Sequence, residues 1–414
     1  MMTSDHAYVW TWLPKATEPV PAGRVDQVGN ELRFSYAQSY LARDDAISLQ
    51  PNGLPLQRGQ QRPDVGHDAA GAIRDAAPDS WGMQVLLRRL VGTGAVDTND
   101  LPLITYLTES GSNRVGALDF QASPHTFAER PTHGTLAEVL EAGERLAQGL
   151  PFSPEVDDVL TWGTAIGGAR PKAILVATTG GPPRQLIAKF SVSTDLFPWI
   201  QAEAVGMELA RRCGVQVPAT ELIRTNGRDV LLIERFDRGP NGRRRHVLSG
   251  LTMLGIHEMA FRHTSYTGLV ELIRLKFTDP TATLRELYTR ILINVLLGNT
   301  DDHARNIAAF WDGRHLELTP AYDLCPQPRS TGEASQAMAF GPDGDARSRI
   351  ASVLDAAPLY RLSPAEAASV NERCLETVRT SFDEVCEGLD VAGITRELLW
   401  ERSILNPSIF YPTD

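Results

Sequence analysis

Cysteine is scarce in this chain of 414 residues, and its four cysteines are Cys213, Cys325, Cys374 and Cys386. They are scattered, form no CxxC pair and have no histidine nearby at zinc-ligand spacing, so neither a disulfide framework nor a zinc site is expected. Long apolar runs are also missing, and prolines interrupt the one apolar stretch within the first thirty residues. The sequence therefore predicts a cytoplasmic protein with no secretion signal and no membrane segment.

Positive charge is in deficit as well, because the formal net charge is −11 and the sequence pI is about 5.4. This balance argues against a protein whose main task is to coat nucleic acid or an anionic membrane. The densest cationic run, residues 243–245, is interpreted as a solvated loop, with a local basic patch as the alternative. Hydrophobic residues make up 42% of the chain, which is ample for a large core and suggests two or three subdomains.

The first part of the chain reads as a small β structure followed by helices. Short runs that alternate apolar and polar residues fill positions 7–60 and are separated by Gly, Pro and Asn, which is typical of a small twisted sheet or barrel. Residues 79–94 and 136–149 have helical periodicity, and Thr135 is suited to cap the second helix.

From residue 160 onward the pattern changes. A hairpin of 173–178 and 186–192 is expected first, followed by a helix over 200–214 that ends at Gly214. Two strands, 219–225 and 229–236, are then joined by the turn Asn226-Gly227. The rest of the chain is expected to be helical, with one hairpin near 307–320. This order is the layout of a two-lobed kinase, so the predicted fold class is α+β. The predicted domains are an N-terminal β-rich subdomain (1–125), a nucleotide-binding lobe (126–236) and a helical catalytic lobe (237–414).

Residues 291–306, ILINVLLGNTDDHARN, carry the strongest chemical signal. An apolar helix runs into a loop with two aspartates, a histidine and an asparagine. Phosphoryl transfer needs a carboxylate that orients the attacking hydroxyl and oxygen ligands for magnesium, and protein kinases supply them as an Asp followed five residues later by an Asn. Asp301 and Asn306 have that spacing, whereas Asp302 does not. Asp301 is therefore the predicted base and Asn306 a predicted Mg²⁺ ligand.

A second carboxylate follows the expected hairpin in the segment LTPAYDLCP, at the place where kinases carry their main magnesium ligand. This is Asp323. The alternative for the acidic loop is a set of solvated carboxylates at a helix end. Lys189, inside the apolar strand LIAKF, favours the kinase interpretation because a lysine there can hold nucleotide phosphates; an edge lysine that snorkels to solvent is the alternative.

The motifs GGARPK, LIAKF, LIERFDR, NTDDHARN and LTPAYD, in this order, resemble the HipA family of bacterial serine/threonine kinases, the toxins of type II toxin–antitoxin modules. The segments PDSWG and GSNRVGALDF also resemble the family's N-terminal subdomain. The resemblance runs over most of the chain. It implies the two-lobed kinase fold with an additional N-terminal β subdomain, and ATP and Mg²⁺ as cofactors.

The resemblance also assigns roles to individual residues. The implied nucleotide loop is formed by Gly167, Gly168, Ala169, Arg170, Pro171 and Lys172, whose backbone N–H groups would meet phosphate oxygens. Lys189 would hold the phosphates, and Glu203, on the following helix, would pair with it unless it is an ordinary surface glutamate. This interpretation makes TAIGGARPK a phosphate loop and not merely a turn.

The implied hinge is Glu234, Arg235 and Phe236, whose backbone would hydrogen-bond adenine while the aromatic ring closes the pocket; Phe236 as a plain core residue is the alternative. The second nucleotide-contacting stretch is His303, Ala304, Arg305 and Asn306. His303 would either lie near the transferred phosphate or brace the loop. Tyr322 and Asp323 complete the implied site, with Asp323 as a Mg²⁺ ligand.

The sequence thus predicts an ATP- and Mg²⁺-dependent protein serine/threonine kinase in which Asp301, Lys189 and His303 are the catalytic candidates. The resemblance implies a growth-inhibiting toxin, an aminoacyl-tRNA synthetase as the substrate class, and a helix-turn-helix, HipB-like antitoxin that mediates most contact with operator DNA. A small-molecule kinase and a catalytically idle binding module of a repressor complex are the alternatives. The Lys–Asp–Asn–Asp set argues against the idle module.

One position departs from the family. In relatives, a serine two residues before the glycine pair of the loop is phosphorylated by the enzyme itself, which expels the loop and removes the nucleotide site. That serine falls on Ala165, a natural or an engineered alanine, which has no hydroxyl. We therefore predict that the chain does not switch itself off at this position; Thr164 is the other hydroxyl nearby, and alternation along an extended loop would point it the other way.

Overall fold

The computed structural model describes residues 4–92, 97–130, 172–177, 183–225, 227–329 and 332–412, together with Glu141 and Arg145. The chain divides into two compact units that interleave along the sequence. Unit 1 comprises Met1–Thr194, Leu232–Leu248 and Phe310–Arg314, and unit 2 comprises Asp195–Leu231, Ser249–Ala309 and His315–Asp414. The predicted sequential boundaries at 125 and 236 stay a prediction.

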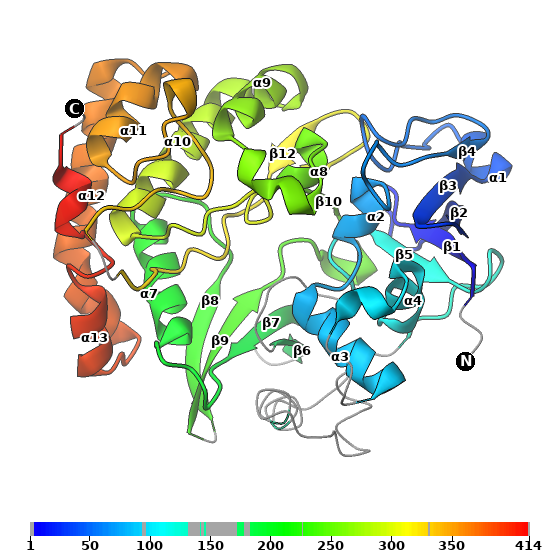
Figure 1. Cartoon of the computed structure of the whole chain (residues 1–414), viewed down its shortest axis with the longest axis horizontal. Coiled ribbons are helices and arrows are strands. Elements are labelled where there is room, and N and C mark those ends of the chain that lie inside the picture. The colour runs from blue at the N-terminus through cyan, green and yellow to red at the C-terminus, as the bar shows by residue number, and fades with distance from the viewer. Residues whose placement is uncertain are drawn as a thin grey trace. The chain divides into compact units, whose positions relative to one another are not determined.

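A five-stranded antiparallel sheet of order β4-β3-β2-β1-β5 forms the N-terminal part of unit 1 (Figure 1). Its strands are β1 (His6–Thr11), β2 (Val20–Val28), β3 (Glu31–Tyr36), β4 (Gln60–Gln61) and β5 (Leu118–Gln121). In β3, Leu32, Phe34 and Tyr36 are buried while the residues between them are partly exposed, because successive side chains of a strand point to opposite faces. The expectation of a small sheet is confirmed.

The helices of unit 1 are short and pack near this sheet. They are α1 (Gln38–Leu41), α2 (Gly71–Asp75), α3 (Ser80–Val91) and α4 (Leu103–Glu109). The predicted helix over 79–94 is confirmed as α3, and the Asp79 side chain caps it by accepting a hydrogen bond from the Gly82 N–H at 2.7 Å. The predicted helix over 136–149 and its cap, Thr135, fall outside the described residues except for Glu141 and Arg145.

Two further sheets contain the remaining strands. One has the order β6-β7-β9-β8, with β6 (Lys172–Ala177), β7 (Arg184–Phe190), β8 (Thr220–Thr225) and β9 (Arg228–Glu234). The other has the order β10-β11-β12, with β10 (His246–Ser249), β11 (Ala308–Trp311) and β12 (Leu316–Leu318). These elements confirm the predicted hairpins. Strand β10 was not predicted, because four residues that begin and end with polar side chains carry little periodic signal.

Unit 2 is mainly helical, as the sequence predicts. Its helices are α7 (Trp199–Arg212), α8 (Gly250–Leu254), α9 (Tyr266–Lys276), α10 (Pro280–Leu297), α11 (Ile350–Ala356), α12 (Pro364–Gly388) and α13 (Gly393–Leu399). Helix α12 packs against α7 and α10 (Figure 1), and the second half of α10 is buried on all sides. Among the described helices, none is both long and apolar enough to cross a bilayer.

Gly298 ends α10 and sets the course of the loop that follows. Its φ of 70° lies in the left-handed region that glycine adopts at helix ends. A Cβ atom at this position would lie 2.4 Å from the carbonyl oxygen of Ser403. Both the turn and the close approach therefore require glycine, and the chain leaves the helix here to form the loop of residues 299–306.

Candidate active site

The loop after α10 separates its two adjacent aspartates. The Asp301 side chain is 63% exposed, whereas Asp302 is 2% exposed as a whole residue. Gly250 allows this loop to pack closely, since a Cβ there would lie 2.6 Å from the Ala304 carbonyl oxygen. The choice of Asp301 over Asp302 for chemistry stays a prediction; the exposure of Asp301 would allow its carboxylate to meet a substrate.

Asp302 braces the loop from inside unit 2. Its carboxylate accepts hydrogen bonds from the Tyr266 hydroxyl at 2.9 Å, the Ala337 N–H at 3.0 Å and the Asn294 amide at 3.4 Å. Burial nevertheless raises the pKa of Asp302 to about 7, because these neutral donors offset only part of the lost hydration. The sequence set Asp302 aside because of its spacing to Asn306 and indicated no structural role for it.

Asp301, His303 and Asn306 surround one turn of the loop. The Asn306 amide donates to the Asp301 carbonyl oxygen at 2.9 Å, and the His303 Nε2 atom lies 4.0 Å from the Asp301 carboxylate. The amide oxygen of Asn306 therefore remains available as a ligand. His303 Nδ1 is buried and has no hydrogen-bond partner within the described chain, so it can still receive or donate one bond to a bound group.

Asp323 has a strained backbone, with a φ of 61° in the left-handed region. Such a conformation is uncommon for residues other than glycine and recurs at functional sites. Neighbouring groups hold the segment in place. The Asn299 amide donates to the Asp323 carbonyl at 3.5 Å and to the Asn294 side chain at 2.9 Å, and the Tyr322 hydroxyl donates to the Arg305 carbonyl at 2.7 Å. Tyr322 thereby ties the Asp323 segment to the loop.

The two predicted chemical acids influence each other. Partial burial raises the pKa of Asp301; His303 opposes this rise, and the negative charge of Asp323 adds to it. Two carboxylates that repel one another are suited to share a cation. No group of three or more His, Cys, Asp or Glu side chains that could hold a metal occurs in the described ranges. The donors present fit Mg²⁺ better than Zn²⁺, since Mg²⁺ is usually held by one or two carboxylates together with water and substrate phosphates.

Unit 1 contains the predicted lysines. In the antiparallel pair β6–β7, Lys172 lies opposite Lys189, so their side chains leave the same face of the sheet. Lys172 is fully buried, and its ammonium group forms an ion pair with Asp79 at 2.5 Å. The acid of the PDSWG motif therefore holds the last residue of the predicted phosphate loop. The other loop residues (Gly167, Gly168, Ala169, Arg170 and Pro171), and also Thr164 and Ala165, lie outside the described part of the chain.

The predicted hinge residues have distinct surroundings in unit 1. The Arg235 N–H donates to the Gln185 carbonyl at 2.9 Å, so this N–H is engaged within the sheet. The ring of Phe236 meets Phe310 edge-on at 5.8 Å, and the Glu234 carboxylate accepts from Arg184 at 3.1 Å. Among the backbone groups of the predicted hinge, the N–H of Arg235 is therefore already bonded.

A buried polar network includes the predicted hinge residue Arg235 and was not predicted from the sequence. Arg235 and Arg238 both bind the Asp237 carboxylate, at 2.8 Å, and both contact Asn113. The Gly116 N–H donates to the same carboxylate at 2.8 Å. The motifs GSNRVGALDF and LIERFDR are thus interlocked, which explains why both contain charged residues flanked by apolar ones.

Comparisons with known proteins agree with this architecture. A family model described as the HipA-like C-terminal domain matches residues 164–385. A Sinorhizobium fredii protein that bears the name of a kinase is 25% identical over 71% of this chain and 72% of its own length. The serine/threonine-protein kinase toxin HipA of Shewanella oneidensis is 28% identical over 72% of this chain and 73% of its own.

The solved complex of Shewanella oneidensis HipA with HipB and operator DNA gives a TM-score of 0.68 at 19% identity, with 95% of this chain and 94% of that chain covered. The fold is therefore that of a two-lobed α+β kinase, as predicted. Because the family model matches more than half of the chain, the protein belongs to the HipA family of serine/threonine kinases.

Proposed function

We propose that this chain is an ATP- and Mg²⁺-dependent kinase that phosphorylates serine or threonine side chains of a protein. The observation that carries the proposal is the pair Asp301 and Asp323 beside the open amide oxygen of Asn306. Partial burial raises the pKa of Asp301, and the negative charge of Asp323 adds to this rise. Such a set has no evident structural use at the protein surface. It matches what phosphoryl transfer requires, namely an accessible base and oxygen ligands for a divalent cation.

Asp301 would orient the substrate hydroxyl and accept its proton. Its exposure leaves room for a substrate side chain, and a raised pKa makes a carboxylate a better proton acceptor. His303 would use its unpartnered Nδ1 atom to hold a phosphate oxygen or to fix the loop. Asp302 would act only through the backbone of Asp301, because it is buried and bound by Tyr266 and Ala337.

Asp323 and Asn306 would hold Mg²⁺, Asp323 through its carboxylate and Asn306 through its amide oxygen. When bound, Mg²⁺ neutralises charge on the nucleotide phosphates and orients them for in-line transfer. Lys189 and the backbone of residues 167–172 would bind the same phosphates, and Glu234 and Phe236 would offer backbone groups to adenine. The ion pair of Lys172 with Asp79 supports a positioning role for Lys172 more than direct contact with the nucleotide.

The biological setting follows from the relatives. The Shewanella oneidensis protein is named as a toxin, and its solved complex contains HipB and operator DNA. We infer that this chain is likewise neutralised by a HipB-like, helix-turn-helix antitoxin. The formal charge of −11 supports operator contact mainly through that partner. An aminoacyl-tRNA synthetase is the substrate class we propose.

The test is incubation of the purified chain with γ-labelled ATP and Mg²⁺, alone and with cell lysate, beside Asp301→Ala and the surface variant Asp383→Ala. We expect labelled protein bands with wild type and Asp383→Ala, and none with Asp301→Ala. Label that appears only in small molecules would establish the alternative, a small-molecule kinase. No label with any variant or added lysate would contradict the proposal and favour an idle binding module.

A further inference from the structure

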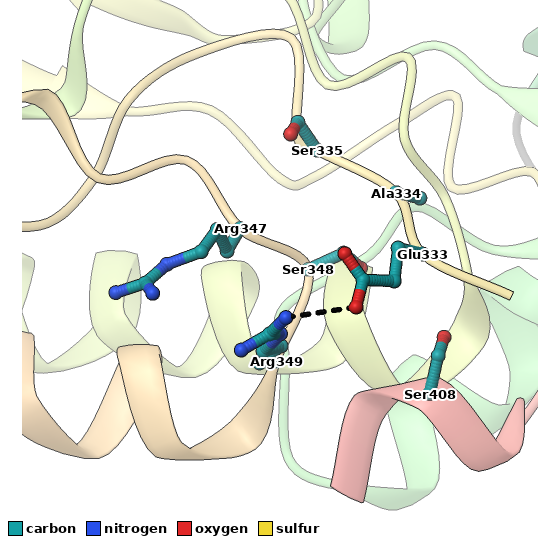
Figure 2. A pocket seen from close by; sticks show the side chains of 7 residues that line it. All are labelled: Glu333, Ala334, Ser335, Arg347, Ser348, Arg349 and Ser408. Atoms are coloured by element: carbon teal, nitrogen blue, oxygen red, sulfur yellow. Dashed lines mark hydrogen bonds and ion pairs between the residues drawn. The ribbon is translucent and has the colours of Figure 1, made fainter. Parts of the chain in front are cut away.

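A pocket of about 300 Å³ lies in unit 2 and includes none of the residues assigned to the active site (Figure 2). Its walls combine two arginines, three serines and one glutamate, contributed by residues 333–335, residues 347–349 and Ser408. A volume of this size is at the lower end of the range for small-molecule sites, roughly 300–1,000 Å³. The pocket can therefore hold a small anion together with a short organic group.

Backbone hydrogen bonds fix the walls. The Ser348 N–H donates to the Ala334 carbonyl at 2.8 Å, and the Gln336 N–H donates to the Ala346 carbonyl at 2.7 Å. These bonds join the two wall segments as a short antiparallel pair in which Ser335 faces Arg347. The third wall, around Ser408, is held by the Asn406 side chain, which accepts from the Ser408 hydroxyl at 2.7 Å. The site is preformed, so binding need not order a loop.

Arg329 places a positive charge behind the serines. Its guanidinium donates to the Ser348 hydroxyl at 3.0 Å and to the Ser408 hydroxyl at 3.2 Å. The Arg329 Nε atom is buried without a hydrogen-bond partner, and the described residues include no carboxylate paired with this arginine. Burial lowers the pKa of Arg329, as expected for a buried cation without compensation by a neighbouring negative charge. An anion in the pocket would supply it.

The pocket also offers hydrogen-bond donors. The Ser348 hydroxyl accepts from Arg329, and within the described chain its own proton has no acceptor, so it can donate into the cavity. The Arg349 side chain is 10% exposed and donates to the Pro412 carbonyl at 2.7 Å and to Glu333 at 3.0 Å. Figure 2 shows Arg349 and Glu333 pointing toward one another at the pocket.

Two carboxylates limit the positive charge. Glu333 pairs with Arg349, and Asp345 binds Arg347 through two bonds of 3.0 Å. The Glu333 side chain is 67% exposed, so it can swing into solvent at little cost and leave Arg349 to a ligand. The Asp345 pair leaves Arg347 as a secondary contributor.

We propose that this pocket binds the phosphate group of a small phosphomonoester or free phosphate. Arg349 and the Ser348 hydroxyl would contact the phosphate oxygens, Arg329 would stabilise the charge from behind, and Glu333 would compete for Arg349 when the pocket is empty. A guanidinium fork and hydroxyl donors are the groups that recognise phosphate in proteins. No bond is formed or broken in this step. The proposal does not depend on the kinase activity.

Calorimetric titration of the full chain with inorganic phosphate and with O-phosphoserine tests the proposal at constant ionic strength. Arg349→Gln should weaken binding about tenfold or more, because hydrogen bonds to charged groups contribute about 1.5–3 kcal/mol. Ser348→Ala should weaken it by a smaller factor. Glu333→Gln should strengthen it, since the competing charge is removed while the exposed side chain keeps its shape.

The control is Arg402→Gln, an exposed arginine outside the pocket walls, which should leave affinity unchanged. Tighter binding of O-phosphoserine than of phosphate would identify a monoester as the ligand, and equal affinities would identify free phosphate. The opposite signs expected for Arg349→Gln and Glu333→Gln keep the test independent of any loss of folding. Absence of binding, or binding that neither variant changes, would overturn the proposal.

Discussion

Asp237 in unit 1 and the adjacent acids Asp301 and Asp302 in unit 2 have opposite electrostatic surroundings. In unit 1, burial alone would raise the pKa of Asp237, but the charges and hydrogen bonds of Arg235 and Arg238 bring it well below its ordinary value. In unit 2, Asp301 and Asp302 have raised pKa values, and no arginine among the described residues is bound to either of them. The first arrangement compensates the charge of the carboxylate locally. In the second arrangement no arginine compensates the acids: Asp301 is exposed enough for a bound cation to do so, whereas buried Asp302 holds its proton more tightly.

Burial by itself does not distinguish these two kinds of environment. Asp237 and Asp302 are both buried, yet one is saturated by cations and the other only by neutral donors. Stability requires the first kind of environment, because an isolated buried charge is costly. A site that must bind a cation or a proton uses the second kind.

The largest effect is expected for Asp301→Ala. Phosphoryl transfer should fall by about 10²- to 10⁴-fold, the usual contribution of a positioned general base, while ATP binding and Tm stay near wild type because the side chain is exposed. Asp323→Ala should remove turnover by losing the Mg²⁺ ligand. Rate assays with nucleotide-binding measurements check both. A wild-type rate for Asp301→Ala together with an inactive but folded Asp302→Ala would show that the register of the loop is wrong.

The next effect concerns stability. Asp237→Ala leaves Arg235 and Arg238 buried without their carboxylate, and breaking a buried ion pair costs about 3–5 kcal/mol. Urea denaturation should show this loss in the free energy of unfolding. Asp45→Ala, which breaks a surface pair with Arg43, is the matched control and should change stability little. Equal losses of unfolding free energy in Asp237→Ala and Asp45→Ala would contradict the special role of the buried carboxylate.

Asp302→Asn should produce a smaller, pH-dependent effect. The ordinary pKa of the carboxyl is 3.8 and burial raises it to about 7, so between these values the folded state keeps a proton that the unfolded state has released. Wild-type stability from this group therefore falls as pH rises from about 4 to 7 and stays low above that. Asp302→Asn has no carboxyl group to titrate at this position, so its stability should not show this fall with pH.

Denaturation at pH 5 and pH 8 checks this sign. The difference in unfolding free energy between the two pH values should be smaller in Asp302→Asn than in wild type, by on the order of 1 to 4 kcal/mol. Tyr266→Phe is a useful companion, because it removes one donor and leaves the acid in place. An identical pH dependence in wild type and Asp302→Asn would refute the raised pKa.

The smallest expected effect is an absence of change at the predicted phosphate loop. Incubation with Mg²⁺ and ATP should leave residues 164–172 unmodified by intact-mass and peptide analysis, because Ala165 has no hydroxyl to accept phosphate. An added serine, Ala165→Ser, should gain one phosphate and lose ATP affinity, since a phosphoserine carries about −1.5 to −2 charges. Phosphate on Thr164 of the wild type, with loss of ATP binding, would contradict the prediction.

Local patterns were enough to predict most elements. Alternation predicted β3, the apolar run from residue 291 predicted the C-terminal part of α10, and strand-like runs around short turns predicted the hairpins. Strand β10 was missed because its four residues form a strand only through pairing with β11. Such pairing is non-local and leaves little trace in a short segment.

For the active site, the sequence supplied residue types and spacing, and these singled out Asp301, Asn306 and Asp323 because the chemistry depends on local order along the loop. Only the tertiary structure decided what their neighbours do. It buried Asp302 against Tyr266 and Ala337, paired Lys172 with Asp79, and joined Asn113 to Arg235. These partners lie 35 or more positions apart in the chain, and nothing in a single sequence says that two such residues will meet. These contacts set the balance of charge around each acid. The fold and not the sequence pattern therefore determines which acids are compensated by cations and which are not.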